Sequence, residues 1–148
     1  MDQPLPALDE LLDQVRATRT IDLAMLERAV GATLRETDDS NDSVVFYSAQ
    51  GVRSGSYTLD LDFRTPVKGG DATSGALLVL DLSGPCVHRA EIEARYGRLN
   101  LSQAPRGESL DEEASWSHRE PWGELSFGFT ERKPDCLRSV VFALSKRG

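Results

Sequence analysis

The residues best suited to chemistry in this chain are its two cysteines and two histidines. Cys86 and Cys136 are too few for a zinc site built from cysteines, and they do not form a CxxC pair. They could form one disulfide in an oxidising compartment or remain two buried thiols, and their even number favours the disulfide. His88 and His118 stand in no catalytic or metal-binding motif. The sequence therefore predicts no catalytic residue, no metal site and no cofactor, and we expect a protein that is not an enzyme.

Two acidic clusters are the next candidates for a site. The first contains Asp38 and Asp39, and the second contains Glu112 and Glu113. Each cluster lies in the connection between the first and second strand of a predicted group of four. They are either solvated loops or surfaces that steer a basic partner, and steering raises the association rate more than the affinity. The stretch around Asp39 lacks the ligand spacing and the glycine of an EF-hand loop, which argues against calcium.

Both tryptophans of the chain, Trp116 and Trp122, flank a turn that contains Pro121 and Gly123. A tryptophan beside a turn is costly to leave in water. It is therefore either a core residue under the loop or an anchor in a protein interface, where tryptophan is enriched. We treat both tryptophans, together with the four acidic residues named above, as candidate partner-binding residues.

Length and charge narrow the class of protein. The chain has 148 residues, enough for one domain with a hydrophobic core, and 17 basic against 24 acidic side chains give a net charge of -7. This charge repels nucleic acid and anionic lipid, and no apolar run is long enough to span a membrane. We therefore expect no nucleic acid partner and no membrane insertion. The net charge either serves solubility alone or favours a protein partner that is basic or locally basic.

The elements that must position these residues follow a repeated order. Asp22 as N-cap and Gly31 as C-terminal glycine delimit a helix over 22–30, and the segment 21–31 aligns without a gap on 87–97, which predicts a second helix. Four apolar or alternating stretches follow each helix and predict strands. The predicted strands are 32–35, 44–49, 57–63, 76–82, 98–102, 114–118, 123–130 and 136–144. A flexible loop is expected at 65–74.

This order predicts an α+β fold of two successive α-ββββ units that form an antiparallel sheet, with the helices packed on one face. We expect one α+β domain over 21–148, made of units 21–83 and 84–144, and an N-terminal arm or loosely docked helix over 1–20. The strand 76–82 is almost wholly apolar and is predicted to be central. The predicted core comprises Leu26, Leu59, Leu61, Phe63, Ile92, Leu125, Phe127, Phe129 and Phe142.

Several segments of the second half carry a resemblance to a known group of proteins. The runs Pro121–Phe129 and Pro134–Phe142, with Gly84-Pro-Cys-Val-His88 and Ala94-Arg-Tyr-Gly97, resemble small proteobacterial envelope proteins of the effector-immunity type. The resemblance covers residues 76–144. The repeated layout is also similar to that of β-lactamase-inhibitor-like proteins, although each unit there starts with a helix pair and the second unit here shows one helix.

The resemblance implies an immunity protein that binds and inhibits a secreted antibacterial effector, typically a cell-wall or lipid hydrolase, in the periplasm. The alternative is a non-enzymatic envelope assembly or scaffold module with the same fold. Periplasmic location would require that a signal peptide has been removed from the mature form. If Met1 is the native start, we expect the protein to be cytoplasmic.

Overall fold

The computed structural model describes residues 6–67, 75–104 and 106–145. Within these residues the chain forms three helices and one eight-stranded antiparallel sheet, so the predicted α+β class is confirmed. The elements are, in chain order, α1 (Pro6–Thr18), α2 (Leu23–Val30), β1 (Arg35–Glu36), β2 (Val44–Ser54), β3 (Tyr57–Pro66), β4 (Leu77–Ser83), α3 (Arg89–Tyr96), β5 (Asn100–Gln103), β6 (Glu113–Glu120), β7 (Gly123–Thr130) and β8 (Leu137–Leu144). Most of the loop expected at 65–74 lies outside the described residues.

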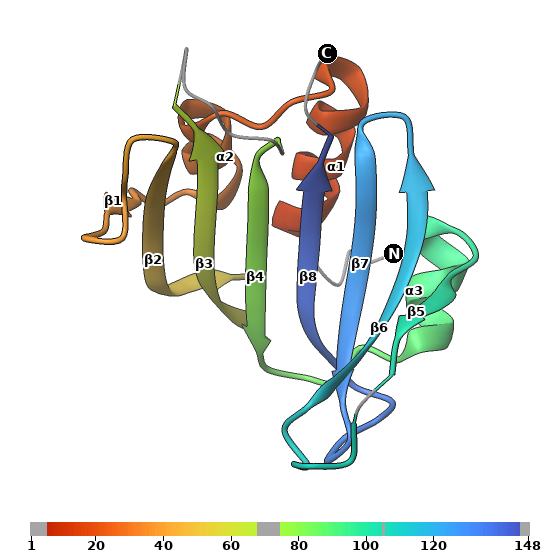
Figure 1. The fold of residues 1–148 in the computed structure, drawn as a ribbon. Coiled ribbons are helices and arrows are strands. Elements are labelled where there is room, and N and C mark those ends of the chain that lie inside the picture. The colour runs from red at the N-terminus through yellow and green to blue at the C-terminus, as the bar shows by residue number, and fades with distance from the viewer. Residues whose placement is uncertain (1–5, 68–74, 105, 146–148) are drawn as a thin grey trace.

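The strands follow the order β1-β2-β3-β4-β8-β7-β6-β5, and every neighbouring pair is antiparallel. Two runs of four consecutive strands therefore meet at one junction, where β4 pairs with β8 and Val79 lies opposite Val141. This agrees with the prediction of a central strand at 76–82. Figure 1 shows the sheet in front, with the ribbons of α1, α2 and α3 behind it.

Local sequence signals account for the ends of α2 and for the start of α3. The Asp22 carboxylate accepts a hydrogen bond from the backbone N–H of Met25 at 2.8 Å, and Gly31 ends α2 in the left-handed conformation at φ 70°. At the start of α3, the backbone N–H of His88 donates to Glu91 Oε1 at 3.2 Å. Both helices therefore begin and end within two residues of the predicted positions.

The hydrophobic core contains every core residue that the sequence predicted. All nine predicted core side chains belong to one cluster, and each is at most 2% exposed. Helix and strand side chains meet within this cluster, as the rings of Tyr96 in α3 and Phe127 in β7 stack with their centroids 5.7 Å apart. The predicted strand register is therefore correct at the core.

The expectation of a loosely docked segment over residues 1–20 is wrong for α1. Its apolar residues recur at helical spacing, and Leu11 and Val15 are 0% exposed. Two ion pairs add to this packing: Arg16 binds Glu120 of β6, and Asp9 binds Arg95 of α3. The helix is therefore an integral part of the core that connects to the second half of the chain.

The first strand also differs from the prediction. The sequence indicated 32–35, whereas β1 covers only Arg35–Glu36. The backbone N–H of Leu34 donates to the carboxylate of Glu27 at 2.8 Å, and the Leu34 side chain is 5% exposed in the core. This contact holds the segment before Arg35 as a connection from α2 into the sheet.

Candidate protein-binding face

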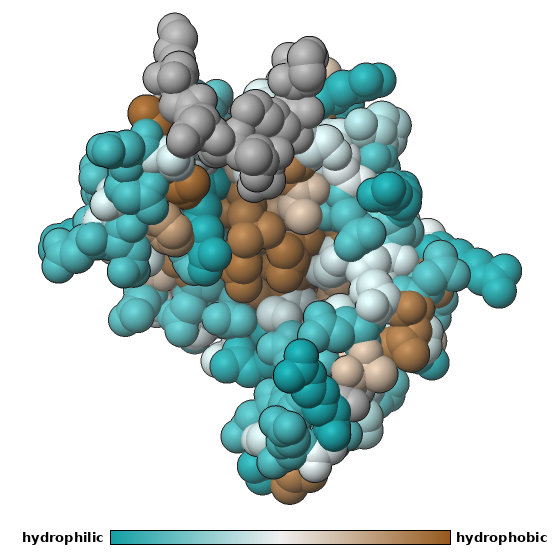
Figure 2. Space-filling model, viewed as in Figure 1, coloured by the Kyte–Doolittle hydropathy of each residue, from teal (hydrophilic) through white to brown (hydrophobic). Residues whose placement is uncertain are grey.

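Alternation along the strands gives the sheet two unlike faces. In β3, the side chains of Leu59, Leu61 and Phe63 lie in the core, whereas Asp60 and Asp62 point to the opposite face. We call this opposite surface the open face. In Figure 2, which has the viewpoint of Figure 1, the open face is turned toward the reader.

The centre of the open face is apolar. Leu77 lies opposite Ala143 and Val79 lies opposite Val141 across the junction of β4 and β8, and all four side chains are partly exposed. Figure 2 shows hydrophobic atoms at the centre of this face, within a hollowed surface surrounded by hydrophilic residues. A contiguous apolar surface with a polar border is typical of a protein-binding site.

A hollow of about 370 Å³ adjoins this apolar centre over β2, β3 and β4. Four carboxylates line it, from Asp39, Asp60, Asp62 and Asp81. Arg64, the only cation among its lining residues, binds Asp62 with an N–O distance of 3.1 Å. The residues that line the hollow therefore carry a net negative charge.

Asp81 faces another carboxylate of the hollow across the sheet. It lies directly opposite Asp60 in the register of β3 and β4, an arrangement in which like charges destabilise a sheet. The Asp81 side chain accepts no hydrogen bond from any described residue, whereas Asp60 accepts one from the backbone N–H of Gly51 at 2.9 Å. Burial raises the pKa of the Asp81 carboxyl, Arg138 opposes this shift, and the charges of Asp60 and Asp62 add to it.

On the part of the open face formed by β5, β6 and β7, polar side chains form hydrogen bonds with one another. The hydroxyls of Ser102, Ser117 and Ser126 form a row across β5, β6 and β7, with O–O distances of 2.7 Å. The Glu113 carboxylate accepts a hydrogen bond from the Ser139 hydroxyl, above Gly128. Any side chain at position 128 would overlap this carboxylate, so glycine allows the close approach.

The predicted acidic residues therefore separate into different environments. Asp39 joins the hollow, whereas Asp38 is exposed and does not line it. Glu112 organises its own loop: hydrogen bonds from the backbone N–H groups of residues 106, 108 and 109 lower the pKa of its carboxyl. Glu113 lies on the open face in β6. The strands β3, β4, β8 and β7 separate β6 from β2, the strand that follows Asp39.

The two tryptophans do not form an exposed anchor. Trp122 is 2% exposed, stacks on Phe142 with centroids 5.6 Å apart and donates its indole N–H to Glu120. Its proposed role as an interface anchor is thus wrong, and the alternative of a core residue under the turn is correct. Trp116 shares the core side of the sheet with Phe127, and the Arg89 guanidinium lies 4.0 Å above its ring.

The carboxylates at the centre of the hollow were missed by sequence reasoning. Asp60 and Asp62 alternate with the apolar residues of β3, and this pattern correctly placed them on the polar face. Their encounter with Asp81 depends on the register between β3 and β4, which the sequence does not display. An isolated aspartate in the almost wholly apolar stretch 76–82 was the available signal.

Known proteins give no further guide to this site. Searches of protein families, curated proteins and solved structures find no match to the chain. Among the described residues no group of three or more His, Cys, Asp or Glu side chains could hold a metal ion, and no described helix is long and apolar enough to cross a membrane. The site is therefore interpreted from its geometry.

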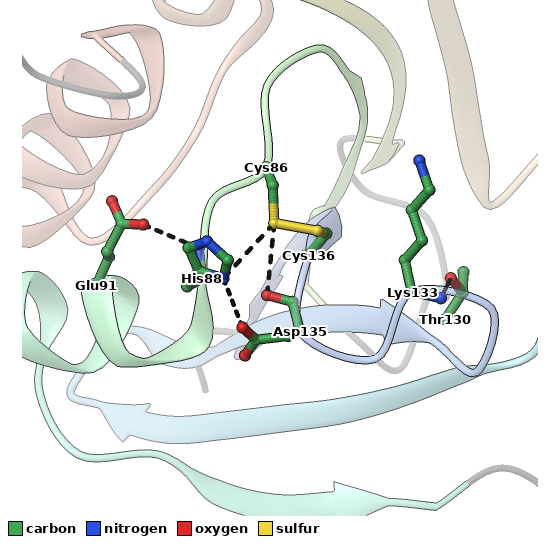
Figure 3. The surroundings of a disulfide bond; sticks show 7 residues. All are labelled: Cys86, His88, Glu91, Thr130, Lys133, Asp135 and Cys136. Atoms are coloured by element: carbon green, nitrogen blue, oxygen red, sulfur yellow. Dashed lines mark hydrogen bonds and ion pairs between the residues drawn. A yellow bond between two sulfur atoms is a disulfide. The ribbon is translucent and has the colours of Figure 1, made fainter.

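The predicted disulfide between Cys86 and Cys136 is confirmed. It joins the segment before α3 to the start of β8, and Figure 3 shows the side chains of His88 and Asp135 beside it. A cleft of about 410 Å³ next to the disulfide is lined by basic residues, including Arg132 and Arg138. Arg132 is paired with Asp111 and Arg138 donates to the Leu82 carbonyl, while Lys133 also lines the cleft.

Proposed function

We propose that this chain is an immunity protein that binds a secreted antibacterial effector in the periplasm and inhibits it by covering its active site. The observation that carries the proposal is the open face, which combines the apolar centre at Leu77, Val79, Val141 and Ala143 with the carboxylate-lined hollow. An exposed apolar surface of this kind needs a partner to exclude water from it. The residue types favour a partner that is locally basic.

The order of the elements supports a construction from two α-ββββ units in this proposal. Units 21–83 and 84–144 each supply a helix and four strands, and α1 precedes the first unit. The helices would form one layer and leave the opposite face of a broad, continuous sheet for binding. A partner could then contact residues of both units at the junction of β4 and β8.

The disulfide supports the periplasm as the compartment. Disulfides persist in oxidising compartments and are rare in the cytosol. Cys86 is exposed, so a reducing environment would have access to it. The resemblance to proteobacterial envelope proteins agrees with this location, and the proposed target is a cell-wall or lipid hydrolase.

The test uses a candidate effector hydrolase, which is sought first among the genes adjacent to that of this chain. The purified, oxidised proteins should form a stoichiometric complex, and adding the chain should abolish the hydrolase activity. Its association rate constant should fall as salt is raised from 50 to 500 mM, because salt screens the steering by the -7 charge. Bacteria that export the chain to the periplasm should survive exposure to the effector, whereas cells that keep it in the cytosol should not.

Two results would contradict this function, and a third would exclude only the electrostatic steering. Full hydrolase activity in a stoichiometric complex would favour the alternative of an envelope scaffold module. An association rate that does not depend on salt would exclude electrostatic steering. Catalytic turnover of a cell-wall or lipid substrate by the isolated chain would show that it is an enzyme.

A further inference from the structure

We infer that the hollow over β2, β3 and β4 receives a lysine or arginine side chain of the partner protein, which ion-pairs with Asp60 and Asp81 while an adjacent apolar residue of the partner rests on Leu77 and Val79. This inference rests on the proposed function only for the identity of the partner as a protein. It names the part of the open face that carries specificity and the chemistry that it recognises.

The charge of the hollow selects a cation. Four carboxylates and one guanidinium line it, and the guanidinium of Arg64 is already bound to Asp62 and lies 5.1 Å from the centre of the Phe46 ring. The remaining pair, Asp60 and Asp81, stands side by side in the register of β3 and β4. Arg138 acts on Asp81 through its charge, but it donates its hydrogen bond to the Leu82 carbonyl, and no described side chain donates to either carboxylate. A cationic side chain placed there would remove the repulsion between them and supply hydrogen bonds to Asp81.

The neighbouring surface selects a side chain of a protein over a free cation. Asp81 and Val79 project from the same face of β4, and Val79 leads directly to the apolar centre. Lysine and arginine carry an aliphatic stem that covers apolar surface while the charged end makes an ion pair. The described carboxylates do not form a group that could hold a metal ion, which agrees with an organic cation as the occupant.

Asp39 is the one predicted partner-binding carboxylate that lines the same hollow as Asp81. Asp39 comes from the connection between β1 and β2 and lines the hollow at the border of the sheet. It is exposed, so it adds negative potential at the entrance. Asp38 is adjacent in sequence, has the same charge and does not line the hollow, which makes it a matched control.

The experiment uses blocked dipeptides as probes and ¹⁵N–¹H correlation spectra of the oxidised full chain. N-acetyl-Arg-Leu-amide and N-acetyl-Lys-Leu-amide are titrated first, and N-acetyl-citrulline-Leu-amide is the neutral counterpart with nearly the same shape as the arginine probe. We expect saturable shifts of the amides of Asp60, Val79 and Asp81 with both cationic probes and none with citrulline. Comparison of the two cationic probes shows whether guanidinium or ammonium binds better.

Two variants locate the binding within the open face. Asp81→Asn should weaken the arginine probe by about fivefold, the effect expected for loss of one partly exposed charge pair. Asp38→Asn makes the same charge change outside the hollow and should leave binding unchanged. Val79→Ser keeps the carboxylates and should weaken the cationic probes through the leucine contact.

The outcomes distinguish this inference from the proposed function. Shifts that never saturate, or equal binding of arginine and citrulline probes, would overturn the inference. It would also be overturned if Asp81→Asn and Asp38→Asn had equal effects. Binding of the effector with an unchanged affinity in Asp81→Asn would refute the cation site and leave the immunity function intact. Specific binding of the probes without any inhibition of the effector would support the site and refute the function.

Discussion

Carboxylates on the two sides of the sheet differ in their hydrogen-bond partners. On the side of the helices, Asp9 and Glu120 each accept two hydrogen bonds from one arginine, at distances between 2.7 and 3.1 Å. Tyr96 also donates to Asp9, and Trp122 also donates to Glu120. On the open face, by contrast, Asp60 and Asp81 face each other across two strands and no described side chain donates to either.

This difference separates residues that stabilise the fold from residues that, in our proposal, bind a partner. The pairs of Asp9 and Glu120 attach α1 to α3 and β6, so their charges are compensated within the chain. The pair on the open face weakens the sheet, and its retention is explained if a partner compensates it. Strained electrostatics of this kind cluster at functional sites.

The largest expected loss of stability comes from truncating a side chain on the side of the sheet that packs against the helices. Phe127 is 0% exposed, so Phe127→Ala should lower the free energy of unfolding by about 3 to 5 kcal/mol. Val79→Ala is the matched change on the open face, and because Val79 is only partly buried it should cost about 1 kcal/mol or less. Urea denaturation of both variants measures the difference, and equal losses would refute the assignment of the two faces.

The second largest change in stability is expected at Glu120. Glu120→Gln weakens the bidentate pair with Arg16 and should destabilise the fold by about 2 kcal/mol, as expected for a partly buried hydrogen bond to a charged group. Glu124→Gln makes the same change on the open face, where Glu124 accepts one hydrogen bond at 3.5 Å, and should have little effect.

The pH dependence of Glu120→Gln gives an independent test. Hydrogen bonds from Arg16 hold the pKa of Glu120 below the ordinary value of 4.5, more than burial raises it. A carboxylate with a lowered pKa in the folded state stabilises the fold above the unfolded pKa, and this contribution is lost as the pH falls through the folded value. The stability difference between wild type and variant should therefore shrink below pH 4.5, and a constant difference would exclude this pair as its source.

The smallest expected change in stability is a gain. Asp81→Asn removes a charge that faces Asp60, so at pH 7 it should stabilise the isolated protein by up to about 1 kcal/mol. Because the pKa of Asp81 is raised above the ordinary value of 3.8, the wild type loses stability relative to this variant as the pH rises through the folded pKa. Thermal denaturation at several pH values measures this trend, and a destabilised Asp81→Asn would show that Asp81 serves the fold.

Local signals in the sequence were sufficient for part of this structure. Asp22 and Gly31 delimit α2 through hydrogen bonds to nearby residues, and the alternation in 57–63 assigns each side chain to a face. These features depend on neighbours within a few positions, so a single sequence reveals them. The apolar residues of α1 also recur at helical spacing in the sequence, but Pro4 and Pro6 favoured the prediction of a loose arm.

Features that depend on distant pairing were not predictable. The junction of β4 with β8 pairs residues that are 58 to 66 positions apart in the sequence, and it forms the apolar centre of the open face. The contact of Asp60 with Asp81 requires the register of β3 and β4. The choice between core residue and interface anchor for Trp122 depends on its contact with Phe142, which lies 20 residues further along the chain in β8.

The position of β8 has a consequence for the order in which the molecule can be assembled. Among the described strands β8 is the last to be synthesised, yet it lies at the centre of the sheet and is the only strand of the second run that pairs with the first. Until residues 137–144 have left the ribosome or the translocon, β4 and β7 both present unpaired edges. Such edges pair readily with other chains. A nascent chain that stalls before Leu137 should therefore be the species most in need of a chaperone.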